Sequence, residues 1–174
     1  MTFTIQEDSF FLNNKKVFLN SGEIHYFRIK RELWDKHLDA AKEAGLKTIS
    51  TYVPWAWHES EEGTFDFNGS SVPECDLAGW FERCQAHGLT CIVKPGPFIL
   101  AEYRGAGLPD WFMDQHGTEV KMRNSKGGIV ASDGVSLFNQ KYLEKIMKQG
   151  AEKAIASADV TMKIVRKAMG LNYY

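Results

Sequence analysis

The sequence of 174 residues lacks the features that mark secreted, membrane-spanning or disulfide-rich proteins. Its three cysteines, Cys75, Cys84 and Cys91, are odd in number, and their spacing fits neither a disulfide framework nor a zinc site. No apolar run is long enough to span a membrane, and no basic start is followed by an apolar segment. We therefore expect a cytoplasmic protein without disulfides or metal ions, in which the cysteines are small buried apolar residues.

Charge of one sign is also lacking. The chain has 21 Lys and Arg residues against 22 Asp and Glu residues, and neither sign forms a block. We expect neither nucleic acid nor an anionic membrane as a partner. The glycine-rich motifs that bind phosphate groups, G-x-G-x-x-G and G-x-x-x-x-G-K-[ST], are absent as well, so we expect no nucleotide and no other cofactor.

Strand and turn signals are present at the start of the chain. Apolar residues at 10–12 and 17–19 flank a polar turn at 13–16, which predicts a β-hairpin. Residues 23–27 then alternate between polar and apolar side chains, which predicts a further strand.

Helix and strand patterns alternate over the next part of the chain. Trp34, Leu38 and Ala41 recur at helical spacing, and Gly45 stands where a helix commonly ends. A β-branched strand pattern follows at 48–53, and the same order repeats with a helix at 77–88 and a strand at 90–93. This alternation predicts an α/β fold with a parallel sheet.

The rest of the chain is less regular. A short helix begins near 108–112, and helical patterns occupy 137–147 and 151–169. The last of these is amphipathic. We expect it to cover the open edge of the sheet, or else this edge to mediate self-association.

Each predicted parallel strand is followed by aromatic residues next to ionisable ones, at 25–28, 52–59 and 95–103. Functional groups of parallel α/β folds gather at the carboxyl ends of the strands. Aromatic rings cover the apolar faces of sugars, and carboxylates accept hydrogen bonds from sugar hydroxyls. The pattern thus favours a carbohydrate ligand.

The same segments resemble a known family. The motifs are Ser-Gly-Glu-Ile-His-Tyr at 21–26, Thr-Tyr-Val-Pro-Trp at 51–55 with His58 and Glu59, Pro-Gly-Pro-Phe-Ile at 95–99 with Ala101 and Glu102, and Gly-Leu-Pro at 107–109 with Trp111. In this order, over about residues 11–111, they resemble the N-terminal part of the family 35 glycoside hydrolases, the β-galactosidases.

The resemblance implies a (β/α)₈ barrel that hydrolyses β-galactosides with retention of configuration, by means of two carboxyl groups. In the family, the acid/base glutamate lies in an Asn-Glu pair after the fourth strand, and the nucleophile lies further on. No Asn-Glu pair occurs in this sequence, so the resemblance assigns no catalytic residue here. It assigns four substrate-binding residues: Tyr52, Ile99, Ala101 and Glu102.

We therefore expect one domain over residues 1–174: a partial barrel with three βα units, a hairpin before it and a helical tail over 137–174. A truncated enzyme of this kind would have weak activity or none. The alternative is a non-catalytic fragment that binds sugar or complements a partner. A carboxylate pair made of Glu59 and Glu102 is a further, less favoured site, and His25 and His58 are more typical of structural residues. Ala56, Ser60, Leu100 and Tyr103 depart from residues common in the family.

Overall fold

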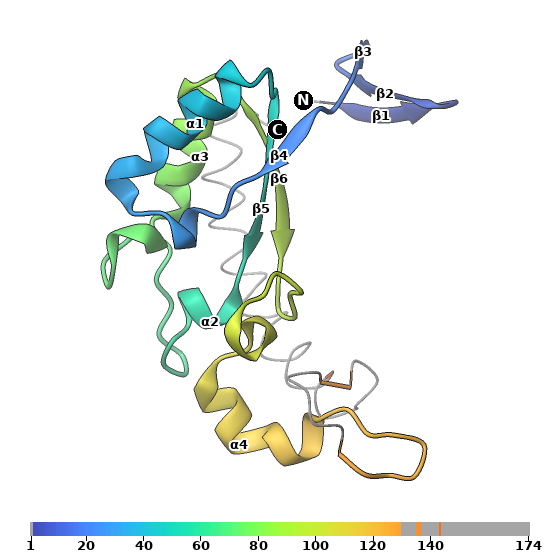
Figure 1. Ribbon diagram of the computed structural model, residues 1–174, viewed down its shortest axis with the longest axis vertical. Coiled ribbons are helices and arrows are strands. Elements are labelled where there is room, and N and C mark those ends of the chain that lie inside the picture. Colours follow the sequence, from blue (N-terminus) through green and yellow to red (C-terminus); the bar gives the residue numbers. More distant parts are fainter. Residues whose placement is uncertain (1, 130–134, 137–142, 144–174) are drawn as a thin grey trace, which may run out of the picture.

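The computed structural model describes residues 2–129, 135, 136 and 143. Within this part of the chain, two three-stranded sheets are present, one antiparallel and one parallel (Figure 1). The helical patterns predicted for the tail lie outside the described residues, except for residue 143. No helix among the described residues is both long enough and apolar enough to cross a bilayer.

The N-terminal sheet consists of β1 (Phe3–Gln6), β2 (Ser9–Leu12) and β3 (Lys15–Val17). The predicted hairpin is confirmed as β2 and β3, but the second strand begins at Lys15 instead of residue 17, and the turn is limited to Asn13 and Asn14. Both asparagines have a positive φ, as tight hairpin turns require. Strand β1 was not predicted, because its alternating pattern covers only four residues.

The parallel sheet contains β4 (Ser21–Glu23), β5 (Thr48–Val53) and β6 (Thr90–Pro95), in the order of the sequence. This arrangement confirms the predicted α/β class. The strand predicted at 23–27 is wrong, since β4 ends at Glu23 and Tyr26–Arg28 form a 3₁₀ turn, η1. Tyr26 and Phe27 are both buried, and an extended strand would point these two neighbours to opposite faces.

Two helices, α1 (Trp34–Glu43) and α3 (Leu77–Ala86), cover one side of the parallel sheet (Figure 1). The main core lies between them and the sheet, where the rings of Trp34 and Trp80 meet edge to face with centroids 5.4 Å apart. The remaining helical elements are short turns and one longer helix: η2 (Arg31–Leu33), α2 (Trp55–His58), η3 (Pro73–Cys75), η4 (Arg104–Gly107) and α4 (Asp110–Val120).

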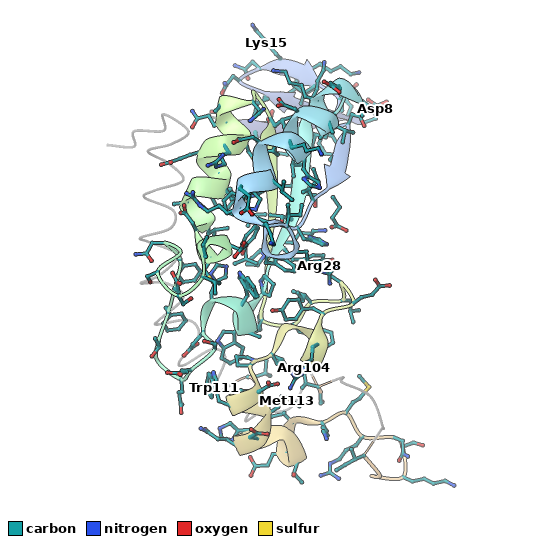
Figure 2. The ribbon with its side chains drawn as sticks, turned by 60° about the vertical axis from the view of Figure 1, so that its left-hand side comes forward. Asp8, Lys15, Arg28, Arg104, Trp111 and Met113 are labelled. Atoms are coloured by element: carbon teal, nitrogen blue, oxygen red, sulfur yellow. The ribbon has the colours of Figure 1, made fainter. Side chains whose placement is uncertain are left out.

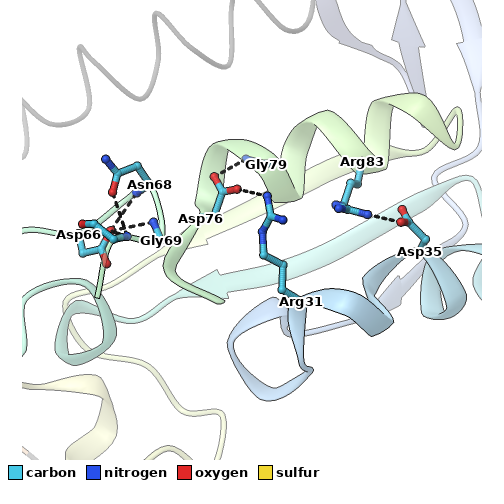
Figure 3. A network of polar contacts seen from close by, with 9 residues as sticks. Arg31, Asp35, Asp66, Asn68, Gly69, Asp76, Gly79 and Arg83 are labelled. Atoms are coloured by element: carbon cyan, nitrogen blue, oxygen red, sulfur yellow. Dashed lines mark hydrogen bonds and ion pairs between the residues drawn. The ribbon is translucent and has the colours of Figure 1, made fainter. Parts of the chain in front are cut away.

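Ion pairs join α3 to the start of α1 and the turn before it (Figure 3). Asp76 caps α3 by accepting a hydrogen bond from the Gly79 amide at 2.8 Å, and it also pairs with Arg31 at 2.5 Å. At the other end of α3, His87 and Arg83 both bind Asp35 and lower the pKa of its carboxyl group. Both ends of α3 are therefore tied to the segment in which α1 begins.

The cysteines occupy ordinary packing positions. Cys75 and Cys84 are buried, and Cys91 is partly buried on β6. All three are free thiols, and the predicted burial is confirmed for Cys75 and Cys84 but only in part for Cys91. Burial raises the pKa of Cys75, so this thiol is a poor nucleophile.

Candidate functional site

The candidate site lies at the carboxyl ends of the three parallel strands. Tyr52 on β5 is directly paired with Lys94 on β6, and Glu23 on β4 is paired with Ser50 on β5. Residues two apart on a strand share a face, so Glu23, Tyr52 and Lys94 extend from the same side of the sheet. Residues 24–28, 54–59 and 96–107 follow these strands along the chain.

Opposite charges meet at this position. The Lys94 ammonium donates a hydrogen bond to Glu23 Oε1 and lies 3.9 Å from the centroid of the Tyr52 ring. The bond from Lys94 lowers the pKa of Glu23, so this carboxylate is charged at neutral pH. Burial opposes the charge of Lys94, but the Glu23 carboxylate raises the pKa of the ammonium above its usual value. The two groups thus form a charged pair next to an aromatic ring.

His25 completes this group. Its ring centroid is 5.6 Å from that of Tyr52, and its Nε2 atom is 3.9 Å from Glu23 Oε2. Burial lowers the pKa of His25, which keeps the imidazole neutral at neutral pH. Its Nδ1 atom is buried and has no hydrogen-bond partner in the described part of the chain.

The loop after β6 holds three of the four residues that the sequence assigns to substrate binding. Ile99 is buried, with only 2% of its surface exposed, and its amide donates to the Ala106 carbonyl at 2.8 Å. Ala101 is partly buried, and Glu102 is exposed. Tyr52, the fourth, is partly buried on β5. Tyr52 and Glu102 therefore have side-chain surface that a ligand could contact, whereas the Ile99 side chain is buried under the rest of the loop.

Contacts from another segment hold this loop in shape. Arg28, which lies where the loop passes the end of the sheet (Figure 2), donates a hydrogen bond to the carbonyl oxygen of Ala101. The next residue, Glu102, has a φ of 52°, a strained value for a side chain of this type. Strained backbone of this kind persists where its surroundings fix it, and it is typical of ligand-binding loops.

His58 is a structural residue. It is 2% exposed, its Nε2 atom lies 2.5 Å from the Tyr26 hydroxyl, and its Nδ1 atom lies 2.5 Å from the Asp66 carbonyl oxygen. Since a carbonyl only accepts, Nδ1 carries the proton, and Nε2 accepts from the tyrosine. Burial lowers the pKa of His58 to about 4, so the ring is neutral over most of the pH range.

The Asp66 side chain orders the loop that follows. Its two oxygens accept hydrogen bonds from four successive backbone amides, of residues 68–71, and from the Ser71 hydroxyl. Figure 3 shows Asn68 and Gly69 turned toward this carboxylate. Burial alone would raise the pKa of Asp66, but these bonds lower it well below the usual range.

Glu59 is also committed to structure. The residue is 3% exposed, and its carboxylate accepts hydrogen bonds from the indole of Trp55 at 2.5 Å and from the Gly63 amide at 2.7 Å. Its carbonyl oxygen accepts a hydrogen bond from Trp111. A carboxylate used in this way is not available to a substrate, so the structure does not support the pairing of Glu59 with Glu102.

Glu23 and Lys94 were not predicted as members of the candidate site. The signal that could have revealed them is the presence of opposite charges at the carboxyl ends of strands that lie in one parallel sheet. In the described residues, no group of three or more His, Cys, Asp or Glu side chains is arranged to hold a metal ion.

Comparison with known sequences identifies related proteins. The family model described as glycosyl hydrolases family 35 matches residues 9–158. A β-1,2-glucosyltransferase of Ignavibacterium album is 42% identical over 82% of this chain and 20% of its own length. An exo-β-D-glucosaminidase of Pyrococcus horikoshii is 36% identical, with 79% and 18% covered, and a β-galactosidase of Xanthomonas manihotis is 35% identical, with 85% and 23% covered. The chain thus spans about a fifth of the length of these relatives.

Solved structures show the same fold at low sequence identity. The β-galactosidase of the psychrophilic Marinomonas ef1 superposes with a TM-score of 0.57 at 13% identity, over 74% of this chain and 18% of that one. The β-galactosidase of Halorubrum lacusprofundi superposes with a TM-score of 0.54 at 19% identity, over 77% and 19%.

Proposed function

Because the chain belongs to glycosyl hydrolases family 35, we propose that it supplies the sugar-holding part of a glycoside hydrolase that acts on terminal β-galactosides. The observation that carries this proposal is the placement of a partly exposed tyrosine, Tyr52, near the carboxyl end of β5 and of an exposed carboxylate, Glu102, in the loop that follows the neighbouring strand β6. This edge is where parallel α/β enzymes bind their substrates.

Each group has a distinct task in the proposed complex. The Tyr52 ring covers apolar C–H groups of the sugar, and its hydroxyl makes a hydrogen bond. The Glu102 carboxylate accepts hydrogen bonds from sugar hydroxyls, and such charge-assisted bonds are stronger than neutral ones. Ala101 contributes its backbone, and the buried Ile99 supports the loop from below.

The proposed reaction is hydrolysis with retention, which needs one carboxyl group as acid and base and a second as nucleophile. The resemblance assigns neither role to a residue of this sequence. We therefore propose that these residues bind the sugar without turning it over efficiently on their own. A non-catalytic sugar-binding role is the second candidate, and the same sugar site serves both.

A second sugar class also has support. Two of the relatives described above have names that do not refer to galactose. One is a β-1,2-glucosyltransferase, and the other is an exo-β-D-glucosaminidase. An exposed carboxylate such as Glu102 suits the ammonium group of an amino sugar as well as neutral hydroxyls. We propose glucosaminides as the alternative substrate class.

Titration calorimetry with galactose, glucosamine and glucose tests these proposals. Galactose is expected to bind the chain saturably, and Glu102→Gln is expected to weaken binding by about tenfold, the loss of one charge-assisted hydrogen bond. The matched control is Glu43→Gln, an exposed glutamate at the end of α1, close to the amino end of β5. Tighter binding of glucosamine than of galactose would favour the alternative class. If no sugar binds, or if both variants behave alike, the proposal is wrong.

A further inference from the structure

We propose that Glu23 and Lys94 form a clamp that positions the phenol ring of Tyr52 for sugar binding, which makes Lys94 a positioning residue of this site. The inference rests on the proposed function. It adds two residues from two other strands to the side chains that the resemblance assigns to the sugar.

The register of the sheet brings the three groups together. Lys94 and Tyr52 are direct cross-strand partners, so their side chains leave the sheet side by side. Glu23 pairs with Ser50, two residues before Tyr52, and thus lies diagonally across from the ring. A one-residue shift in this register would separate them, because it would turn Lys94 to the opposite face.

The contacts of Lys94 explain how the clamp works. Its ammonium is 3.9 Å from the centroid of the Tyr52 ring, within the range where a cation is attracted to an aromatic face. The same ammonium donates a hydrogen bond to Glu23, which favours its position over the ring. The ring of His25 contacts Tyr52 as well, at 5.6 Å between centroids. With these neighbours, Tyr52 has fewer orientations to lose when a ligand binds.

A purely stabilising ion pair is the competing explanation. The side chains of Glu23 and Lys94 are 47% and 34% exposed, and exposed ion pairs add little to folding stability. The pair is also placed at the carboxyl ends of the strands, where ligands bind, and not at the amino ends. The effect of the clamp is therefore expected in sugar affinity rather than in stability.

The first test needs no sugar. The ring current of Tyr52 is expected to shift the ε-methylene protons of Lys94 upfield in NMR spectra. Tyr52→Leu should remove this shift, and Glu23→Gln should reduce it. A Lys94 resonance at the position of an ordinary exposed lysine would overturn the clamp, whatever the result with sugars.

The second test measures galactose affinity by calorimetry. Lys94→Met is expected to weaken binding about fivefold, a coupling typical of contacting residues, whereas Lys94→Arg should restore most of it. In the Tyr52→Leu background, Lys94→Met should have a much smaller effect, because the aromatic ring that Lys94 contacts is gone. Lys47→Met, a lysine next to the amino end of β5, is the matched control and should leave affinity unchanged.

The outcomes separate the clamp from the proposed function. Equal affinities for Lys94→Met and Lys47→Met, or additive effects of Lys94→Met and Tyr52→Leu, would overturn the positioning role. A wild-type chain that binds no sugar but keeps the shifted Lys94 resonance would instead overturn the proposed function and leave the clamp as a structural fact.

Discussion

The hydroxyl of Tyr26 lies 2.5 Å from Nε2 of His58, and both side chains are buried. This bond joins the turn that follows β4 to the short helix α2 that follows β5. Through its other nitrogen, His58 reaches the backbone of Asp66 and thus the loop before α3. The His58 imidazole therefore links three segments: the turn η1, the helix α2 and the loop before α3.

Removal of the Tyr26 hydroxyl tests this connection. Tyr26→Phe leaves the buried Nε2 atom of His58 without a donor, and an unsatisfied buried group costs about 1 to 3 kcal/mol of unfolding free energy. Urea denaturation followed by circular dichroism measures this loss. Tyr103→Phe is the matched control, since its ring packs against the same Phe27 but its hydroxyl makes no hydrogen bond to the described residues. Equal losses in both variants would contradict the prediction.

The pH dependence of stability follows from His58. Its pKa falls from 6.5 in the unfolded chain to about 4 in the fold, so the folded state favours the neutral ring. The resulting stability is fully present above pH 6.5 and is lost as the pH falls toward 4, by about 3 kcal/mol in total.

The measurement is the unfolding free energy in urea at a series of pH values. His58→Asn is expected to be less stable at pH 7 and to lose much less stability between pH 6.5 and pH 4. The lowered pKa of His25 acts in the same direction, so His25→Asn serves as the comparison. A wild-type stability that does not change over this range would show that His58 is not held neutral.

Asp76 has two functions that a pair of substitutions can separate. Asp76→Ala removes the cap on α3 and the bond from Arg31, and should cost about 1 to 2 kcal/mol. Asp76→Asn keeps an acceptor for the Gly79 amide but removes the charge, and should cost only about 0.5 kcal/mol. Thermal denaturation compares the two. If the Asn variant is as unstable as the Ala variant, the ion pair and not the cap dominates.

Gly107 is expected to be irreplaceable for two reasons. It has a φ of +82°, and a Cβ atom there would lie 2.7 Å from Cγ1 of the buried Ile99. Gly107→Ala should therefore cost about 3 kcal/mol, from backbone strain and overpacking together. Gly105→Ala is the control, because Gly105 also has a positive φ but a Cβ atom there would meet no described atom within 4 Å, and it should cost about 1 kcal/mol. Similar losses in urea denaturation would show that contact with Ile99 is unimportant.

Arg28 should affect sugar binding without contacting the sugar. Arg28→Met removes the bond to the Ala101 carbonyl and allows the strained Glu102 to relax, so galactose affinity should fall by about tenfold. Arg104→Met is the control, since Arg104 forms an exposed ion pair with Asp110 and, unlike Arg28, donates no hydrogen bond to the Ala101 carbonyl among the described residues. Calorimetry of both variants, with unfolding measured in parallel, distinguishes a loss of loop position from a loss of fold.

Much of the fold could be predicted because long, regular segments carry a clear signal. The apolar spacing in α1 and α3 and the β-branched residues of β5 identify their elements directly. The prediction was wrong at Tyr26 and Phe27, because the alternating polar and apolar pattern continues into a turn. Tertiary packing buries both of these residues in that turn. Local pattern cannot reveal such packing.

The candidate site was predictable only in part, for a related reason. Motif resemblance points to Tyr52 and Glu102, which follow strands along the chain. Lys94 and Glu23 are 71 residues apart, and only the register of a sheet makes them partners. Similarly, the sequence shows Glu59 as a carboxylate but not that Trp55 and Gly63 occupy it.

The order of the parallel sheet has a consequence for the way the chain assembles. Since β4, β5 and β6 neighbour one another in the order in which they are synthesised, each strand can dock on the one made just before it, with its connecting helix closing over the pair. Among the described strands, no pairing in this sheet skips over an intervening strand of the same sheet. Pairing of segments that are closer in sequence favours faster folding than pairing of remote ones. The loops of the candidate site would thus be in place early, as soon as β6 and the loop that ends at Gly107 have left the ribosome.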